Sequence, residues 1–126
     1  MPFSVNWDND HILVKNFVPV LCFMYEHSCG IAAGDFDETL GTHEDWDYWI
    51  RLSRICTPVH LKRVTCEFRA RNDGKSLTAS RRADFLRTAR LIHKKHRAYA
   101  AGNKVVQEQQ KRFLQDVEKS LAQGEG

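Results

Sequence analysis

The segment 42–53, with the sequence THEDWDYWIRLS, constrains the fold of this chain more than any other. Trp46 and Trp49 recur at the spacing of one helix face, so the segment predicts an amphipathic helix whose aromatic rings belong mainly to a core. Thr42 stands where it can cap that helix, with Asp45 three residues later as in a capping box. We therefore expect a helix with an acidic first turn beside an aromatic face.

The acids of that first turn, Glu44 and Asp45, have two interpretations. A carboxylate at a helix N-terminus commonly does no more than complement the helix dipole. A carboxylate within reach of a bound hydroxyl can instead accept its proton as a general base. Spacing alone favours the dipole role.

Length and composition predict one domain with a hydrophobic core, because the 126 residues are 42% hydrophobic. No stretch is apolar enough over the length that a membrane span needs, and the N-terminus does not resemble a secretory signal, so we expect a cytoplasmic protein. The cysteines lack C-x-x-C spacing and favour reduced, buried thiols over a zinc site or a disulfide framework. They are Cys22, Cys29, Cys56 and Cys66.

Charge is divided unevenly along the chain. Residues 1–59 hold three Lys or Arg against nine Asp or Glu, and residues 60–104 hold thirteen against three. Such a division often flanks an anionic ligand, for example nucleic acid or a diphosphate. One alternative is therefore a non-enzymatic interaction module whose basic segment 60–104 binds nucleic acid or an anionic membrane surface. Specific nucleic-acid binding is not expected, because the aromatic interleaving, helix-turn-helix and zinc patterns of such proteins are missing.

The remaining elements predict a mixed α/β unit, with two or three strands in residues 1–78 and a helical hairpin in residues 79–126 packed on it. Alternation and apolar runs indicate the strands, and apolar stripes followed by Gly102 indicate the hairpin. The expected elements are helical turns at 10–15 and 26–30, strands at 17–25 and 59–69, and helices at 80–101 and beyond 104.

Four motifs, in this order, resemble the C-terminal half of family-2 glycosyltransferases. They are Asn16-Phe-Val-Pro19, Gly34-Asp-Phe-Asp-Glu38, Glu44-Asp-Trp-Asp-Tyr-Trp-Ile-Arg-Leu52 and Phe68-Arg-Ala-Arg71. Enzymes of that family have the GT-A fold and transfer a sugar from a nucleotide donor to an acceptor hydroxyl. The resemblance therefore implies a partial GT-A fold over about residues 10–80 and an inverting glycosyltransferase of polysaccharide biosynthesis.

The resemblance also implies roles for single residues. Asp45 falls on the family's general base, which takes the acceptor proton as the oxygen attacks the anomeric carbon. The other implied roles are an orienting carboxylate at Glu44, acceptor stacking at Trp46 or Trp49, and contact with the leaving diphosphate at Arg69 and Arg71.

Two departures limit this resemblance. The family's His is replaced by Arg71, which cannot ligate a metal, and residues 1–16 cannot supply the nucleotide-binding unit with its metal-binding Asp-x-Asp. The chain has three Asp-x-Asp patterns, but none is expected to hold a metal because hard cations need several converging oxygens. These patterns are Asp8/Asp10, Asp35/Asp37 and Asp45/Asp47.

The chain is therefore expected to be inactive alone and to need a separate N-terminal donor-binding half. A complete enzyme would use Mn²⁺ or Mg²⁺, a nucleotide-sugar donor and a glycan or lipid-linked acceptor, and could work at the inner face of the membrane. A sheet edge left open by the absent half would also favour self-association.

Overall fold

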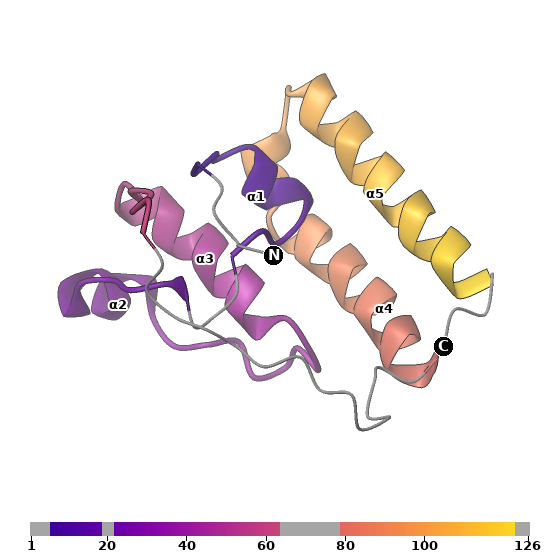
Figure 1. Ribbon diagram of the computed structural model, residues 1–126, viewed down its shortest axis with the longest axis horizontal. Helices are drawn as coiled ribbons and strands as arrows, with labels where there is room; N and C mark the ends of the chain where they lie inside the picture. Colours follow the sequence, from indigo (N-terminus) through magenta and orange to yellow (C-terminus); the bar gives the residue numbers. More distant parts are fainter. Residues whose placement is uncertain (1–5, 19–21, 64–78, 123–126) are drawn as a thin grey trace.

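The computed structural model describes residues 6–18, 22–63 and 79–122, and all regular secondary structure in these ranges is helical. Figure 1 shows α4 and α5 side by side as a hairpin, α1 between that hairpin and α3, and α2 on the far side of α3. The elements are α1 (His11–Val14), α2 (His27–Ala33), α3 (Glu44–Ile55), α4 (Ala79–Lys95), the 3₁₀ helix η2 (Arg97–Ala100) and α5 (Lys104–Ala122).

The strands predicted at 17–25 and 59–69 are absent from the part of the chain that the structure describes. Residues 19–21 and 64–69 lie outside that part, but the described remainder of both segments is irregular, apart from a single 3₁₀ position at Cys22. The α/β class, and with it the partial GT-A fold, is therefore wrong for this structure.

The described residues of the apolar run at 17–25 contact α3 through side chains and do not pair with another strand. Phe23 stacks on Trp49 with ring centroids 4.0 Å apart, and Trp49 Nε1 donates a hydrogen bond to the Val18 carbonyl at 3.2 Å. Of the described residues in this run, Phe17, Val18, Cys22 and Phe23 are half-buried, whereas Met24 and Tyr25 are exposed. A short apolar run therefore does not by itself specify a backbone conformation.

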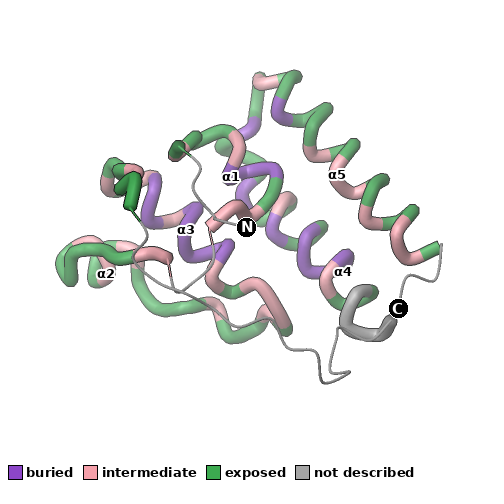
Figure 2. The backbone as a smooth tube through the Cα atoms, viewed as in Figure 1, coloured by how far each residue is buried: buried purple, intermediate pink, exposed green. Residues whose placement is uncertain are grey.

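The predicted aromatic core is confirmed. Trp46, Trp49 and Ile50 are 0%, 1% and 0% exposed, and the indole of Trp46 donates to the Ile12 carbonyl at 2.6 Å. Figure 2 shows the buried parts of α1, α3 and α4 turned toward one another. This packing holds the N-terminal turn of α3, with its two acids, in a fixed position.

The two C-terminal helices are present, but the first is shorter than predicted. The α-helix ends at Lys95, His96 leaves helical geometry with φ −106° and ψ 20°, and the chain continues as η2. The predicted turn at Gly102 is observed, with φ 78°. Within the described ranges, no helix combines the length and the apolar character that crossing a membrane requires.

A disulfide joins Cys29 of α2 to Cys56 at the C-terminal end of α3, with the two Cα atoms 6.5 Å apart. The prediction of reduced thiols is therefore wrong for this pair. The two cysteines are 27 residues apart, and their spacing carries no signal for pairing, because only the packing of α2 against α3 brings them together. Cys22 is half-buried, and Cys66 lies outside the described residues.

Candidate functional site

The first turn of α3 follows a residue in the left-handed backbone region. His43 has φ 55° and ψ 31°, a conformation that is uncommon for a residue other than glycine. Its ring lies against Phe85 of α4, with centroids 4.4 Å apart. Burial lowers the pKa of His43 against the opposing charges of Asp45 and Glu44. The predicted cap is wrong, since no side chain caps α3 and Thr42 Oγ1 is buried without a hydrogen-bond partner among the described residues.

Asp45 is half-buried and is held by two donors. Its Oδ1 accepts the backbone N–H of Trp46 at 2.9 Å, and its Oδ2 accepts from Asn16 Nδ2 at 3.4 Å. The Asn16 amide is itself oriented, because its Oδ1 accepts the backbone N–H of Val18 at 3.2 Å. The structure thus brings together two of the motifs found in the sequence, although they are 29 residues apart.

Glu44 lies beside Asp45 in the first turn but is exposed. Among the described residues no hydrogen bond or ion pair of its side chain is recorded, so its orienting role stays a prediction. The position at the helix N-terminus favours both carboxylates electrostatically, as the spacing indicated.

In the described part of the chain, the side chains of the other predicted site residues do not bond to Asp45. Trp46 and Trp49 are buried in the core and their N–H groups bond to backbone carbonyls. Neither ring presents a face to a ligand, and their acceptor-binding role stays a prediction that no contact supports. Arg69 and Arg71 lie outside the described residues, so diphosphate contact also stays a prediction.

A cluster of charged side chains surrounds the buried carboxylate of Asp47. Asp47 is 0% exposed, and its Oδ1 lies 2.6 Å from His96 Nε2 and 3.0 Å from Lys95 Nζ. Arg51 Nε donates to its Oδ2 at 3.1 Å. Burial raises the pKa of Asp47, but the hydrogen bonds from His96 and Lys95 and the charges of Lys95 and Arg51 outweigh it, so the net pKa is lowered. Asp47 is thus an ionised structural carboxylate.

Lys95 extends this cluster to the loop after α2. Its ammonium group also lies 2.8 Å from Asp37 Oδ2. Burial lowers the pKa of Lys95, but the hydrogen bonds and charges of Asp37 and Asp47 raise it more. The hydrogen bonds from Lys95 and Thr39 hold the pKa of Asp37 well below its usual range. One cation therefore joins the loop, α3 and α4.

Sequence reasoning found only part of this cluster. Asp47 and Arg51 are four residues apart on α3, a spacing that predicts contact, and they form an ion pair. His96 is buried at 7% exposure, and its partner Asp47 lies 49 residues away in the sequence. His93 turns inward, where burial lowers its pKa and its Nε2 donates to the Val14 carbonyl at 2.8 Å.

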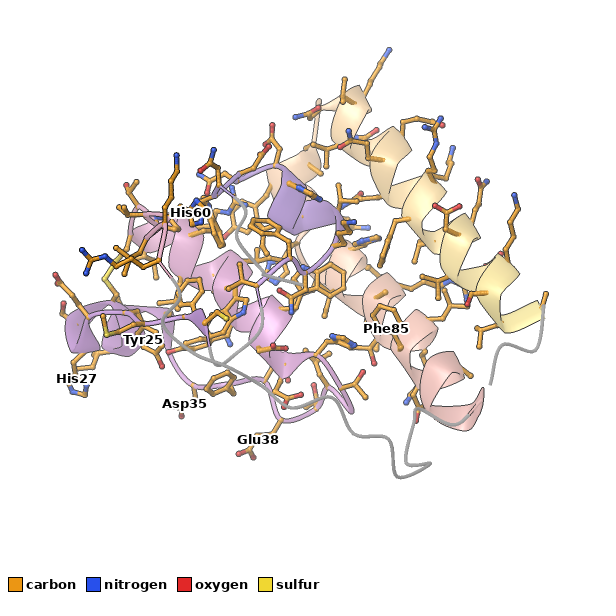
Figure 3. All side chains as sticks on the ribbon, viewed as in Figure 1. Tyr25, His27, Asp35, Glu38, His60 and Phe85 are labelled. Carbon is orange, nitrogen blue, oxygen red and sulfur yellow. A yellow bond between two sulfur atoms is a disulfide. The ribbon has the colours of Figure 1, made fainter. Side chains whose placement is uncertain are left out.

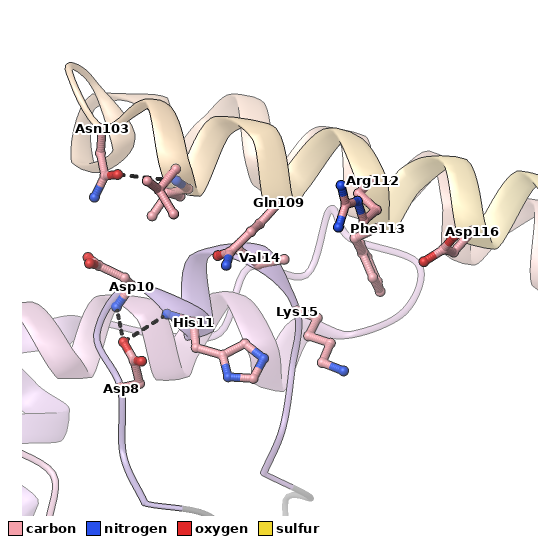
Figure 4. A pocket seen from close by; sticks show the side chains of 12 residues that line it. Asp8, Asp10, His11, Val14, Lys15, Asn103, Gln109, Arg112, Phe113 and Asp116 are labelled. Carbon is pink, nitrogen blue, oxygen red and sulfur yellow. Dashed lines mark hydrogen bonds between the residues drawn. The ribbon is translucent and has the colours of Figure 1, made fainter.

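A groove of about 620 Å³ lies between α1 and α5, away from Asp45 (Figure 4). Charges of both signs line it, including Asp10, Lys15, Arg112 and Asp116, so the lining selects no single class of ligand. In the described ranges, no group of three or more His, Cys, Asp or Glu side chains could hold a metal ion. The use of Mn²⁺ or Mg²⁺ by a complete enzyme stays a prediction.

Comparison with known proteins adds no relative: no family model, no curated protein and no solved structure matches this chain.

Proposed function

We propose that this chain forms the acceptor side of an inverting, nucleotide-sugar-dependent glycosyltransferase, with Asp45 as the general base. The observation that supports the proposal is the contact between Asn16 Nδ2 and Asp45 Oδ2 at 3.4 Å, which joins two motifs of the resemblance. Asp45 takes the proton of an acceptor hydroxyl as its oxygen attacks the anomeric carbon. The bond from that carbon to the nucleoside diphosphate breaks, and the electron pair leaves with the diphosphate.

A donor-binding half is the partner that this proposal requires, and exposed apolar side chains are available for contact with it. Met24, Ile31 and Val59 are 94%, 70% and 87% exposed, and Ile55 and Leu61 are 48% and 63% exposed. These residues belong to α2, to the segment before it and to the chain around the end of α3. The sheet edge once expected to drive self-association has no counterpart among the described residues.

Donor binding by the chain alone tests the need for that half. In titration calorimetry with UDP and Mn²⁺, we expect no heat of binding, because the chain's own sequence supplies no donor site. A micromolar affinity would contradict the requirement for a separate donor-binding half.

The role of Asp45 is tested in a protein that joins this chain to a donor-binding half. Asp45→Asn should lower kcat by about 10²-fold or more, the scale of a lost general base, while circular dichroism stays unchanged. Asp116→Asn removes an exposed acid on α5 and serves as the matched control. Turnover retained in Asp45→Asn would remove Asp45 as the base.

The alternative, an anion-binding interaction module, has less support. Arg87 and Arg90, two basic residues of α4, already form ion pairs with Asp84 and Glu118. Lys95 is engaged by Asp37 and Asp47. Strong, salt-dependent retention on heparin or DNA would favour this alternative.

The proposal also includes a cellular location for the enzyme. A cytoplasmic enzyme, peripheral at the inner face of a membrane, fits an acceptor that is lipid-linked. Disulfides persist mainly in oxidising compartments and are rare in the cytosol, so a cytoplasmic location and the observed Cys29–Cys56 bond make opposite predictions for the state of these thiols in the cell. Thiol alkylation during lysis, followed by mass spectrometry of the Cys29 peptide, distinguishes the two states.

A further inference from the structure

Two exposed aromatic rings flank Tyr48, which lies next to Asp45 on α3. Tyr25 is 42% and Phe36 40% exposed, whereas Tyr48 beneath them is 3% exposed. The Phe36 ring stacks on Tyr48 with centroids 4.3 Å apart and planes at 24°, and Tyr25 tilts against Tyr48 at 5.7 Å. We call the two rings on Tyr48, those of Tyr25 and Phe36, the aromatic ledge. Tyr48 follows Asp45 by three residues, so the two are neighbours on α3.

Contacts from α2 and α3 hold the ledge in place. The Arg51 guanidinium lies over the Tyr48 ring, 4.8 Å from its centroid. It donates to the Ala33 and Asp35 carbonyls at 2.7 and 2.8 Å, which fixes the loop that carries Phe36. The Tyr25 ring lies directly over Gly30, where a Cβ would come within 2.9 Å of it. Rings fixed in this way lose little conformational entropy when a ligand covers them.

The loop that carries Phe36 also carries two exposed acids, Asp35 and Glu38. Figure 3 shows both side chains pointing outward from the loop that follows α2, with Tyr25 just before that helix. Carboxylate oxygens accept hydrogen bonds from hydroxyl groups. An aromatic face with a few polar groups at its edge matches a pyranose, which has an apolar face of C–H groups and a rim of hydroxyls.

We infer that Tyr25 and Phe36 form a platform for a pyranose ring, with Asp35 and Glu38 as acceptors for its hydroxyls. In naming this sugar as the acceptor, the inference rests on the proposed function. The inference assigns stacking against the acceptor sugar to two rings that a ligand can reach, in place of Trp46 and Trp49, which are buried.

Saturation-transfer difference NMR on the whole oxidised chain tests the platform. The probes are methyl β-D-glucopyranoside, methyl β-D-galactopyranoside and methyl α-D-mannopyranoside, at concentrations on the order of 10 mM, because so small a ligand binds weakly. At least one glycoside should receive saturation at its ring C–H protons. The aromatic ¹³C–¹H signals of Phe36 should shift in the same titration.

Phe36→Leu is the decisive variant, because leucine keeps an apolar contact on Tyr48 but removes the flat ring. Saturation transfer should fall about fivefold or more, the scale of one lost aromatic contact. Tyr99→Leu is the matched control, since Tyr99 is an aromatic residue of η2 with 48% exposure and should leave the signal unchanged. Circular dichroism and Tm show whether each variant is folded.

The possible results separate the platform from the proposed function. No transfer to any of the three glycosides, or equal transfer for the wild type and a folded Phe36→Leu, overturns the platform. Neither result bears on the role of Asp45 as the general base, because that role is tested by the turnover of Asp45→Asn. Conversely, saccharide binding that depends on Phe36 supports the platform even where sugar transfer fails.

Discussion

The two sides of α3 are held by different kinds of interaction. Toward α4, the fully buried carboxylate of Asp47 bonds to the buried His96 and to Lys95, whose side chain is partly exposed. Toward α2, no residue of that helix is buried. The α2 side depends on the Cys29–Cys56 disulfide and on hydrogen bonds to the backbone of α2.

This difference predicts different modes of failure. A core maintained by burial opens only when the whole domain unfolds, whereas an element held by a few discrete bonds can detach locally. The platform residues Tyr25 and Phe36 lie on the α2 side, while Asp45 begins the helix that anchors the core. Saccharide binding should therefore be lost more easily than the fold.

The largest effect should come from Asp47→Ala. The substitution leaves Lys95, His96 and Arg51 partly buried without their carboxylate, and removing one partner of a buried ion pair costs about 3–5 kcal/mol. Urea denaturation should show this loss in the free energy of unfolding at pH 7. Asp116→Asn, on the exposed surface of α5, is the control. A loss below about 1 kcal/mol would mean that the cluster is dispensable.

Loss of the disulfide should have a smaller and more local effect. In the Cys29→Ser/Cys56→Ser variant, a cross-link that spans 27 residues is removed, which is typically worth about 2–4 kcal/mol. Because α2 has no buried residue, amide exchange should accelerate in His27–Ala33 and remain slow in α4. Equal acceleration in both helices would contradict the contrast between the two sides. Reduction of the wild type should reproduce the variant's pattern.

Arg51→Lys should weaken both sides at once. Arg51 bonds to Asp47 on one side and to the Ala33 and Asp35 carbonyls on the other, and lysine cannot reproduce the three directions of a guanidinium. We expect a loss of about 1–2 kcal/mol in urea denaturation, the scale of one or two such bonds, together with faster exchange in α2. An effect confined to global stability would show that Arg51 does not hold α2.

The two sides of α3 differ in how much of their structure could be predicted from the sequence. The helix 44–55 and its buried tryptophans follow from spacing, because a 3.6-residue period is a local property. The strand at 17–25 was wrong because a short apolar run does not by itself specify a backbone conformation. The pairs Cys29–Cys56, Asp47–His96 and Asn16–Asp45 were not predictable from composition or period, since each depends on tertiary packing across 27 to 49 residues.

The smallest expected effect is that of Asp37→Asn, which breaks the link from the α2 loop to Lys95. The Asp37–Lys95 pair is partly exposed, with side chains at 23% and 37%, and such pairs contribute about 0.2–1 kcal/mol. Urea denaturation at pH 7 should show a loss in this range. Because Lys95 also bonds to Asp47, the α4 side of the core should stay intact.

The pH dependence of that loss sharpens the prediction. The pKa of Asp37 is lowered in the folded state, chiefly by its hydrogen bond from Lys95, whereas an unfolded Asp titrates near pH 3.9. Its contribution is therefore fully present above about pH 4 to 5 and is lost as the pH falls toward the folded-state pKa. The difference between wild type and Asp37→Asn should shrink between pH 5 and about pH 2. A difference that stays constant over this range would show that a contact other than the charged pair carries it, and the link between the two sides of α3 would then be one of packing.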